Sequence, residues 1–147
     1  MKTIRSLCGW KQEENMKTLE EIKEFFTKDK FAQNCKIEIV RATDGEAECV
    51  MPITDEHKNA VGGVQGGAIF TLADYTIAIA SNFNCDACVS VSASVSYIRV
   101  AKTDTLTAVA TRTGESRHMA FYDVKVSDGL GVIATVKVDG YKIQAKQ

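Results

Sequence analysis

The chain has 147 residues, of which 45% are hydrophobic, and this is enough to build one domain around a single core. Its 18 Lys and Arg residues nearly balance 19 Asp and Glu residues, so the charge gives no indication of nucleic acid as a partner. No apolar run is long enough to span a membrane, and residues 1–15 lack the apolar stretch of a signal peptide. Five scattered cysteines, an odd number, fit reduced thiols in a cytoplasmic protein.

The N-terminal part is predicted to contain a lead-in and one helix. Residues 1–16 are expected to be disordered, and residues 17–147 to form the domain. Thr18 followed by Glu21 is a capping-box pattern. Apolar residues at helical spacing then predict a helix that continues to about Lys30.

A hairpin and a central helix follow. Two strands, residues 35–42 and 46–53, are joined by Asp44-Gly45, a strong hairpin signal. After a loop, a helix is predicted over residues 66–82. This helix is apolar or small on every side except at Asp74, so we expect a sheet to curl around it.

The remainder of the chain is predicted to be strand. In residues 89–100 valine and serine alternate, so that one face is apolar and the other carries hydroxyls. Three further strands follow through short turns, over residues 103–113, 119–127 and 132–143. Antiparallel strands around one buried helix predict the α+β fold class.

Asp74 is the one acid of the predicted central helix. Burial of an ionised carboxylate costs several kcal/mol unless it is paired or hydrogen-bonded. Two interpretations stay open. Asp74 is either a hydrogen-bonded structural or interface carboxylate, or an acid kept for chemistry.

Four glycines, Gly62, Gly63, Gly66 and Gly67, precede and open this helix. The first N–H groups of a helix lack partners and lie at the positive end of its dipole, and glycine lets another group approach closely. Such a start suits an anion, or a carbonyl oxygen that becomes one during reaction. The spacing fits neither a Walker loop nor a dinucleotide fingerprint. A flexible turn with glycines for close packing is the alternative.

The distance along the helix predicts an oligomer. Asp74 follows Gly66 and Gly67 by seven or eight residues, which is roughly 10–12 Å along the axis. A general base must lie within about 3 Å of the group it activates, or one water away. If both features act on one substrate, the acid therefore comes from a second copy of the chain. The sequence thus predicts a homodimer or a dimer of dimers.

The pattern resembles the hotdog fold, and within it the acyl-CoA thioesterases of the phenylacetate pathway. Members of that family carry an Asn, a Gly, a Gly pair that opens the helix, and an acid two turns later. Here Asn59, Gly62, the Gly66-Gly67 pair and Asp74 lie at matching spacing, and His57 also matches many members. Gln65 stands where most members have His.

The resemblance implies a role for each matching residue. The Gly66 N–H would polarise the thioester carbonyl, and Asp74 of the neighbouring subunit would act as general base or nucleophile. Asn59 would position the substrate or the attacking water. Gln65 would orient the carbonyl or the loop, because an amide can donate and accept but cannot transfer protons.

Further residues are expected on the substrate side. Gly67 belongs to the same helix start. Ser90 either helps hold the attacking water or is one of several exposed serines. Arg99 and Lys102, in the turn after the alternating strand, either bind coenzyme A or are solvated surface charges. No cofactor and no metal is expected, because coenzyme A enters as part of the substrate.

Three functions compete at this point. The first is hydrolysis of acyl-CoA thioesters, and the second is a non-catalytic acyl-CoA-binding module, which Gln65 favours. A hotdog dehydratase or hydratase is the third, but such enzymes use a His paired with an acid, and the central helix has no His. Cys85 and Cys88 form one C-x-x-C, which predicts loop cysteines rather than a zinc or redox site, since no second pair exists.

Overall fold

The computed structural model describes residues 17–83 and 87–143, and the predicted lead-in of residues 1–16 lies outside them. The elements follow the order α1 (Leu19–Phe26), α2 (Lys30–Asn34), β1 (Glu38–Thr43), β2 (Glu46–Pro52), the 3₁₀ turn η2 (Asp55–His57), α3 (Gly66–Asn82), β3 (Ala87–Tyr97), β4 (Thr105–Glu115), β5 (Met119–Asp128) and β6 (Gly131–Ile143). Among these described residues, no helix combines the length and the apolar character needed to cross a bilayer.

The capping box at Thr18 is confirmed, but the predicted extension of the helix to Lys30 is wrong. The Thr18 hydroxyl accepts the Glu21 N–H at 3.2 Å, and the Glu21 carboxylate accepts the Thr18 N–H at 2.7 Å. α1 ends at Phe26 because Asp29 begins a second helix, in which its carboxylate accepts the Ala32 N–H at 3.0 Å. Aspartate prefers such a cap to a helix interior.

The predicted hairpin at Asp44-Gly45 is confirmed. β1 and β2 pair in antiparallel fashion on either side of it, with Thr43 opposite Glu46. Gly45 has a φ of +83°, a region that side-chain-bearing residues avoid and that this tight turn requires. The Gly45 N–H also donates to the Ala80 carbonyl at 3.0 Å, which ties the hairpin to the end of α3.

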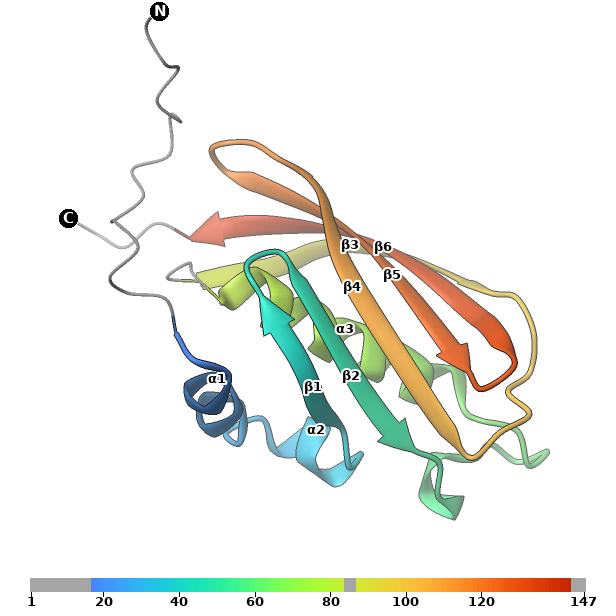
Figure 1. Cartoon of the computed structure of the whole chain (residues 1–147). Coiled ribbons are helices and arrows are strands. Elements are labelled where there is room, and N and C mark those ends of the chain that lie inside the picture. Colours follow the sequence, from blue (N-terminus) through green and yellow to red (C-terminus); the bar gives the residue numbers. More distant parts are fainter. Residues whose placement is uncertain (1–16, 84–86, 144–147) are drawn as a thin grey trace, which may run out of the picture.

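The six strands form one antiparallel sheet in the order β1-β2-β4-β5-β6-β3. Figure 1 shows this sheet curving around α3, which contacts every strand. The predicted α+β class and the helix wrapped by a curved sheet are confirmed.

The core lies between α3 and the concave face of the sheet. On β2, β4, β5 and β6 burial alternates with a period of two, so one face of each strand packs toward the helix. Leu72 and Ile79 of α3 are completely buried there. Each such side chain contributes about 1.5–3 kcal/mol relative to an exposed position.

β3 differs from the other strands because it lies at one edge of the sheet and is largely exposed. Val89 and Val91 keep 45% and 57% of their surface accessible, which is unusual for valines of an eleven-residue strand. A long edge strand with apolar side chains presents unpaired backbone groups to any further strand.

Candidate active site

Gln65 forms the N-cap of α3. Its side-chain oxygen accepts the Ala68 N–H at 3.1 Å, and its own N–H donates to the His57 carbonyl at 2.8 Å. Gly66 and Gly67 are therefore the first two residues of the helix, and Gln65 supplies the cap that they cannot. Of the roles the resemblance implied for Gln65, this geometry supports orientation of the loop and the helix start.

Gly66 and Gly67 present the helix's first N–H groups. Within the described part of the chain, neither N–H has a recorded protein acceptor, whereas the Ala68 N–H is held by Gln65. The Gly66 carbonyl accepts the Tyr97 hydroxyl at 2.9 Å. Two unoccupied donors at the positive end of a seventeen-residue helix make a suitable site for a developing negative charge.

Asn59 organises the glycine loop before α3. Its side-chain oxygen accepts the N–H groups of Val61 and Gly63, both at 3.1 Å. Its backbone N–H donates to the Gly63 carbonyl at 2.8 Å. The Asn59 oxygen is thus used within the loop, and the amide nitrogen is the part of the side chain that can serve a substrate or a water.

His57, which also matched the family pattern, has a structural position. The ring is buried, its Nδ1 lies 3.0 Å from the Thr54 N–H, and its Nε2 lies 3.0 Å from the Cys35 carbonyl. Because the Thr54 N–H can only donate, Nδ1 must accept this hydrogen bond. The proton of the ring is then on Nε2, which donates a hydrogen bond to the Cys35 carbonyl. Nδ1 therefore caps the η2 turn, and Nε2 ties that turn to Cys35, before β1.

Asp74 lies half-buried in the middle of α3, with Ser90 of β3 beside it. The Ser90 hydroxyl donates to the Asp74 carboxylate at 3.3 Å. Burial raises the pKa of Asp74 above its ordinary value, the Ser90 hydroxyl lowers it in part, and the negative charge of Asp29 raises it further. A half-buried acid with a raised pKa and one hydroxyl partner is better placed to accept a proton than a solvated surface acid.

A β-bulge decides which serine meets Asp74. Ser90 pairs with Gly140 and Ser92 with Asp139, so Val91 is an extra residue without a partner on β6. Residues directly opposite share a face, and Gly140 is buried toward α3 whereas Asp139 is not. The predicted single hydroxyl face is therefore wrong: Ser90 faces the helix, and Ser92, Ser94 and Ser96 face away from it.

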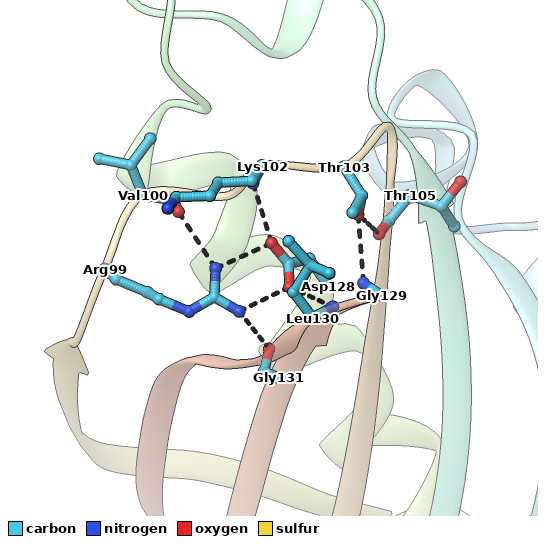
Figure 2. Close-up of polar contacts among 9 residues, drawn as sticks. All are labelled: Arg99, Val100, Lys102, Thr103, Thr105, Asp128, Gly129, Leu130 and Gly131. Atoms are coloured by element: carbon cyan, nitrogen blue, oxygen red, sulfur yellow. Dashed lines mark hydrogen bonds and ion pairs between the residues drawn. The ribbon is translucent and has the colours of Figure 1, made fainter.

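Arg99 is held by Asp128 rather than left free for a phosphate. Figure 2 shows its guanidinium against the Asp128 carboxylate, with bonds of 2.9 and 2.6 Å and a third of 2.9 Å to the Gly131 carbonyl. Arg99 and the Lys102 backbone N–H hold the pKa of Asp128 well below its usual range, against the effect of burial. Nothing in this geometry supports the predicted contact of Arg99 with coenzyme A.

Lys102 lies in the same turn but uses different atoms. Its backbone N–H donates to Asp128 at 2.8 Å, and the residue is exposed. Its ammonium has no recorded protein partner within residues 17–83 and 87–143. Of the two predicted basic residues, Lys102 is therefore the one with a side chain available to a ligand.

The predicted site residues fall into two groups within one protomer. Asn59, Gln65, Gly66 and Gly67 gather at the start of α3, and Asp74 and Ser90 lie near its middle. Asp74 follows Gly66 by eight positions on the helix, about 12 Å along the axis. One chain therefore holds the donors and the acid too far apart to act on the same carbonyl.

The cysteines and the metal-binding side chains add no further site in the described residues. Cys85 lies outside them, and burial raises the pKa of the Cys88 thiol. No three His, Cys, Asp or Glu side chains among residues 17–83 and 87–143 come together in a way that could hold a metal ion.

Comparison with known proteins decides the family. A family model described as the Thioesterase superfamily matches residues 62–134. A putative esterase of Deinococcus radiodurans is 31% identical over 100 residues, which are 67% of this chain and 68% of the relative. The chain belongs to the thioesterase superfamily. The enzyme class is therefore thioester hydrolase, as the family resemblance implied.

Other relatives extend the likeness over more of this thioesterase. The acyl-coenzyme A thioesterase PaaI of Escherichia coli is 28% identical over 102 residues, 69% of this chain and 73% of the relative. A putative esterase of Archaeoglobus fulgidus is 29% identical over 128 residues, 85% of this chain and 83% of the relative. The solved structure of Escherichia coli PaaI matches with a TM-score of 0.79 at 24% identity, over 84% of this chain and 91% of that one, and shows the same fold.

Two residues of the site region make contacts that the sequence did not predict. Tyr97 is the last residue of β3, and its position in the alternating pattern gives no sign that its hydroxyl reaches Gly66. Asp128 lies in the short turn predicted between residues 127 and 132, but its carboxylate binds Arg99, 29 residues away. Both contacts join segments far apart in the sequence, so no local signal reports them.

Proposed function

We propose that this thioesterase hydrolyses acyl-CoA thioesters at sites shared between two copies of the chain. The observation that carries the proposal is the separation just described, with free N–H donors at the start of α3 and a half-buried acid near its middle. A second copy that turns the opposite way would bring the acid of one protomer to the donors of the other.

The exposed edge of β3 supports the way the two copies would meet. Within the described residues β3 pairs only with β6, and its other edge is unpaired along all eleven residues. Pairing of this edge with the same edge of a second copy would satisfy the backbone groups and cover Val89 and Val91. A two-fold axis makes such a pairing antiparallel.

Two contacts between β3 and α3 determine which parts of the two helices this pairing would bring together. Ser90, near the start of β3, binds Asp74 in the middle of α3, and Tyr97, at the end of β3, binds Gly66 at the start of α3. The strand and the helix therefore run in opposite directions. Antiparallel pairing of two β3 strands brings the Ser90 end of one beside the Tyr97 end of the other, and so brings Asp74 toward the partner copy's helix start.

The chemistry then divides between the two copies. Asp74 takes a proton from water, the resulting hydroxide adds to the thioester carbonyl carbon, and the oxyanion accepts the N–H groups of Gly66 and Gly67 of the other copy. The carbonyl re-forms, the C–S bond breaks, and coenzyme A leaves as a thiolate, which a thiol pKa of about 8.5 permits with little acid assistance. Direct attack by Asp74 would give a mixed anhydride that water then hydrolyses.

Release of free thiol from a panel of acyl- and aroyl-CoAs tests the reaction. Removal of a general base lowers rates by roughly 10²–10⁴-fold, so we expect Asp74→Asn to abolish most release while the fold is kept. If no thioester releases thiol but acyl-CoAs still bind, the hydrolase proposal fails and the acyl-CoA-binding module is left as the function.

Co-expression of two inactive chains tests the shared site. One chain carries Asp74→Asn, and the other carries Gly66→Pro, which removes the N–H donor at the first helical position. Random pairing gives half heterodimers with one intact site of two, so about a quarter of wild-type activity should return. Activity that stays at the level of either single variant would contradict the composite site.

A further inference from the structure

The contact between Tyr97 and Gly66 ties the last residue of β3 to the first residue of α3. Tyr97 pairs with Ala134, which is buried, so the tyrosine side chain lies on the helix-facing side of the sheet. Its hydroxyl donates to the Gly66 carbonyl at 2.9 Å, although 54% of the residue is exposed. An exposed tyrosine that holds a backbone carbonyl 31 residues away has a specific position rather than a place in the core.

The absence of a side chain at Gly66 is what admits Tyr97. A Cβ at this position would lie 3.1 Å from both the ring Cζ and the hydroxyl oxygen of Tyr97. Gly66 is not among the described glycines with positive φ, so backbone conformation does not require glycine here. The close approach of the tyrosine favours glycine, because a Cβ here and the Tyr97 ring would have to move apart by a few tenths of an ångström.

The hydroxyl acts on the peptide groups that carry the free donors. A hydrogen bond to the Gly66 carbonyl polarises the peptide that carries the Gly67 N–H, because donation to a carbonyl strengthens the N–H of the same amide. It also fixes the orientation of the first helical turn. Gln65 also holds that turn, through the Ala68 N–H, so within the described residues the N–H groups of Gly66 and Gly67 are the donors left without a protein acceptor.

We infer that Tyr97 is a positioning residue of the thioesterase reaction, whose hydroxyl holds the start of α3 so that Gly66 and Gly67 meet the carbonyl oxygen as it becomes negative. The inference rests on the proposed function. It adds a side chain that acts through the backbone donors, and it gives β3 a part in catalysis at both of its ends.

Tyr97→Phe removes the hydroxyl and keeps the ring. A lost hydrogen bond that matters mainly in the transition state should lower kcat by about 3- to 10-fold and leave KM within about 2-fold. Binding of free coenzyme A and the thermal unfolding midpoint should stay close to wild type. The matched control is Tyr141→Phe, because Tyr141 is similarly exposed at 44% and its ring stacks on His118 instead.

Gly66→Ala provides a second variant, because its Cβ would crowd the end of the Tyr97 ring and shift it by a few tenths of an ångström, which weakens the hydrogen bond to the Gly66 carbonyl. Since Tyr97→Phe removes this hydrogen bond and Gly66→Ala weakens it, the loss in the Tyr97→Phe, Gly66→Ala double variant should be smaller than the product of the single losses. A Tyr97→Phe enzyme with wild-type kcat, or one that changes KM alone, overturns the inference.

The proposed function can fail separately. A wild-type chain that releases no thiol from any thioester would end both the function and this inference. An active wild type that Asp74→Asn inactivates, together with an unchanged Tyr97→Phe, would leave the function standing and remove only the role of Tyr97.

Discussion

The Ser90 hydroxyl donates a hydrogen bond of 3.3 Å to the Asp74 carboxylate, and the unpaired residue Val91 next to it turns the following serines to the opposite face of β3. One extra residue therefore determines that Ser90, and not Ser92, meets the acid of the central helix. Bulges commonly redirect a side chain in this way beside active sites.

Ser90→Ala should shift the acidic limb of the pH–rate profile to higher pH. Asp74 must be ionised to act as base or nucleophile, and the Ser90 hydroxyl lowers its pKa by stabilising the charged form. Loss of the hydroxyl raises that pKa, so more alkaline conditions are needed for half-maximal kcat/KM. Ser92→Ala is the control, because Ser92 faces away from the helix, and it should leave the limb unchanged. Equal shifts in both variants would refute the assignment.

Asp74→Asn should stabilise the fold at neutral pH while it removes activity. Burial raises the folded pKa of Asp74 above the unfolded value of about 3.9, so the folded state favours the protonated form. The contribution of Asp74 to stability is therefore complete below about pH 4 and is lost as the pH rises through the folded pKa. Asparagine is neutral at every pH, so the Asp74→Asn variant should be more stable than wild type at pH 7 and equally stable near pH 3.5. Thermal unfolding of both proteins at the two pH values measures this difference. A midpoint of the variant below that of wild type at pH 7 would contradict the prediction.

Gln65→Ala should cost about 1 kcal/mol of unfolding free energy, because the Ala68 N–H loses its side-chain cap and keeps only the Gln65 backbone carbonyl. Gln65→Ser restores a good capping residue and should recover most of that stability. Comparison of Gln65→Ala with Gln65→Ser separates capping of the helix from contact with the substrate. If Ser recovers both stability and kcat, Gln65 acts through the helix start alone, and if it recovers stability but not kcat, the amide also contacts the substrate. Denaturant unfolding and thiol release give the two readings.

Asp128→Asn should lower the unfolding midpoint at pH 7. Arg99 and the Lys102 N–H hold the folded pKa of Asp128 below the unfolded value of about 3.9. This stabilisation is complete above about pH 4 and is lost as the pH falls toward the folded pKa. The gap between wild type and variant should therefore narrow on acidification. Glu56→Gln, an exposed residue of η2, is the control and should show little gap at either pH. A gap that widens in acid would refute the pairing.

Much of the fold could be predicted because its signals are local. The capping box at Thr18, the turn at Gly45 and the helix from Gly66 to Asn82 depend on neighbouring residues, and the structure has each of them. The predicted end of the first helix was wrong because helical spacing of apolar residues and a capping residue competed near Asp29, and the cap of the second helix prevailed. The spacing of Gly66 and Asp74 on one helix was also readable, since helical rise is fixed.

The sequence by itself determined most of the elements, the family pattern and the separation of donor from acid, because each depends on short-range spacing. Tertiary structure alone decided that β3 lies at the edge, that Ser90 faces Asp74, that Tyr97 holds Gly66, and that Arg99 is committed to Asp128. These facts depend on which strands pair and in what register, and a single bulge reverses which side chains face the helix.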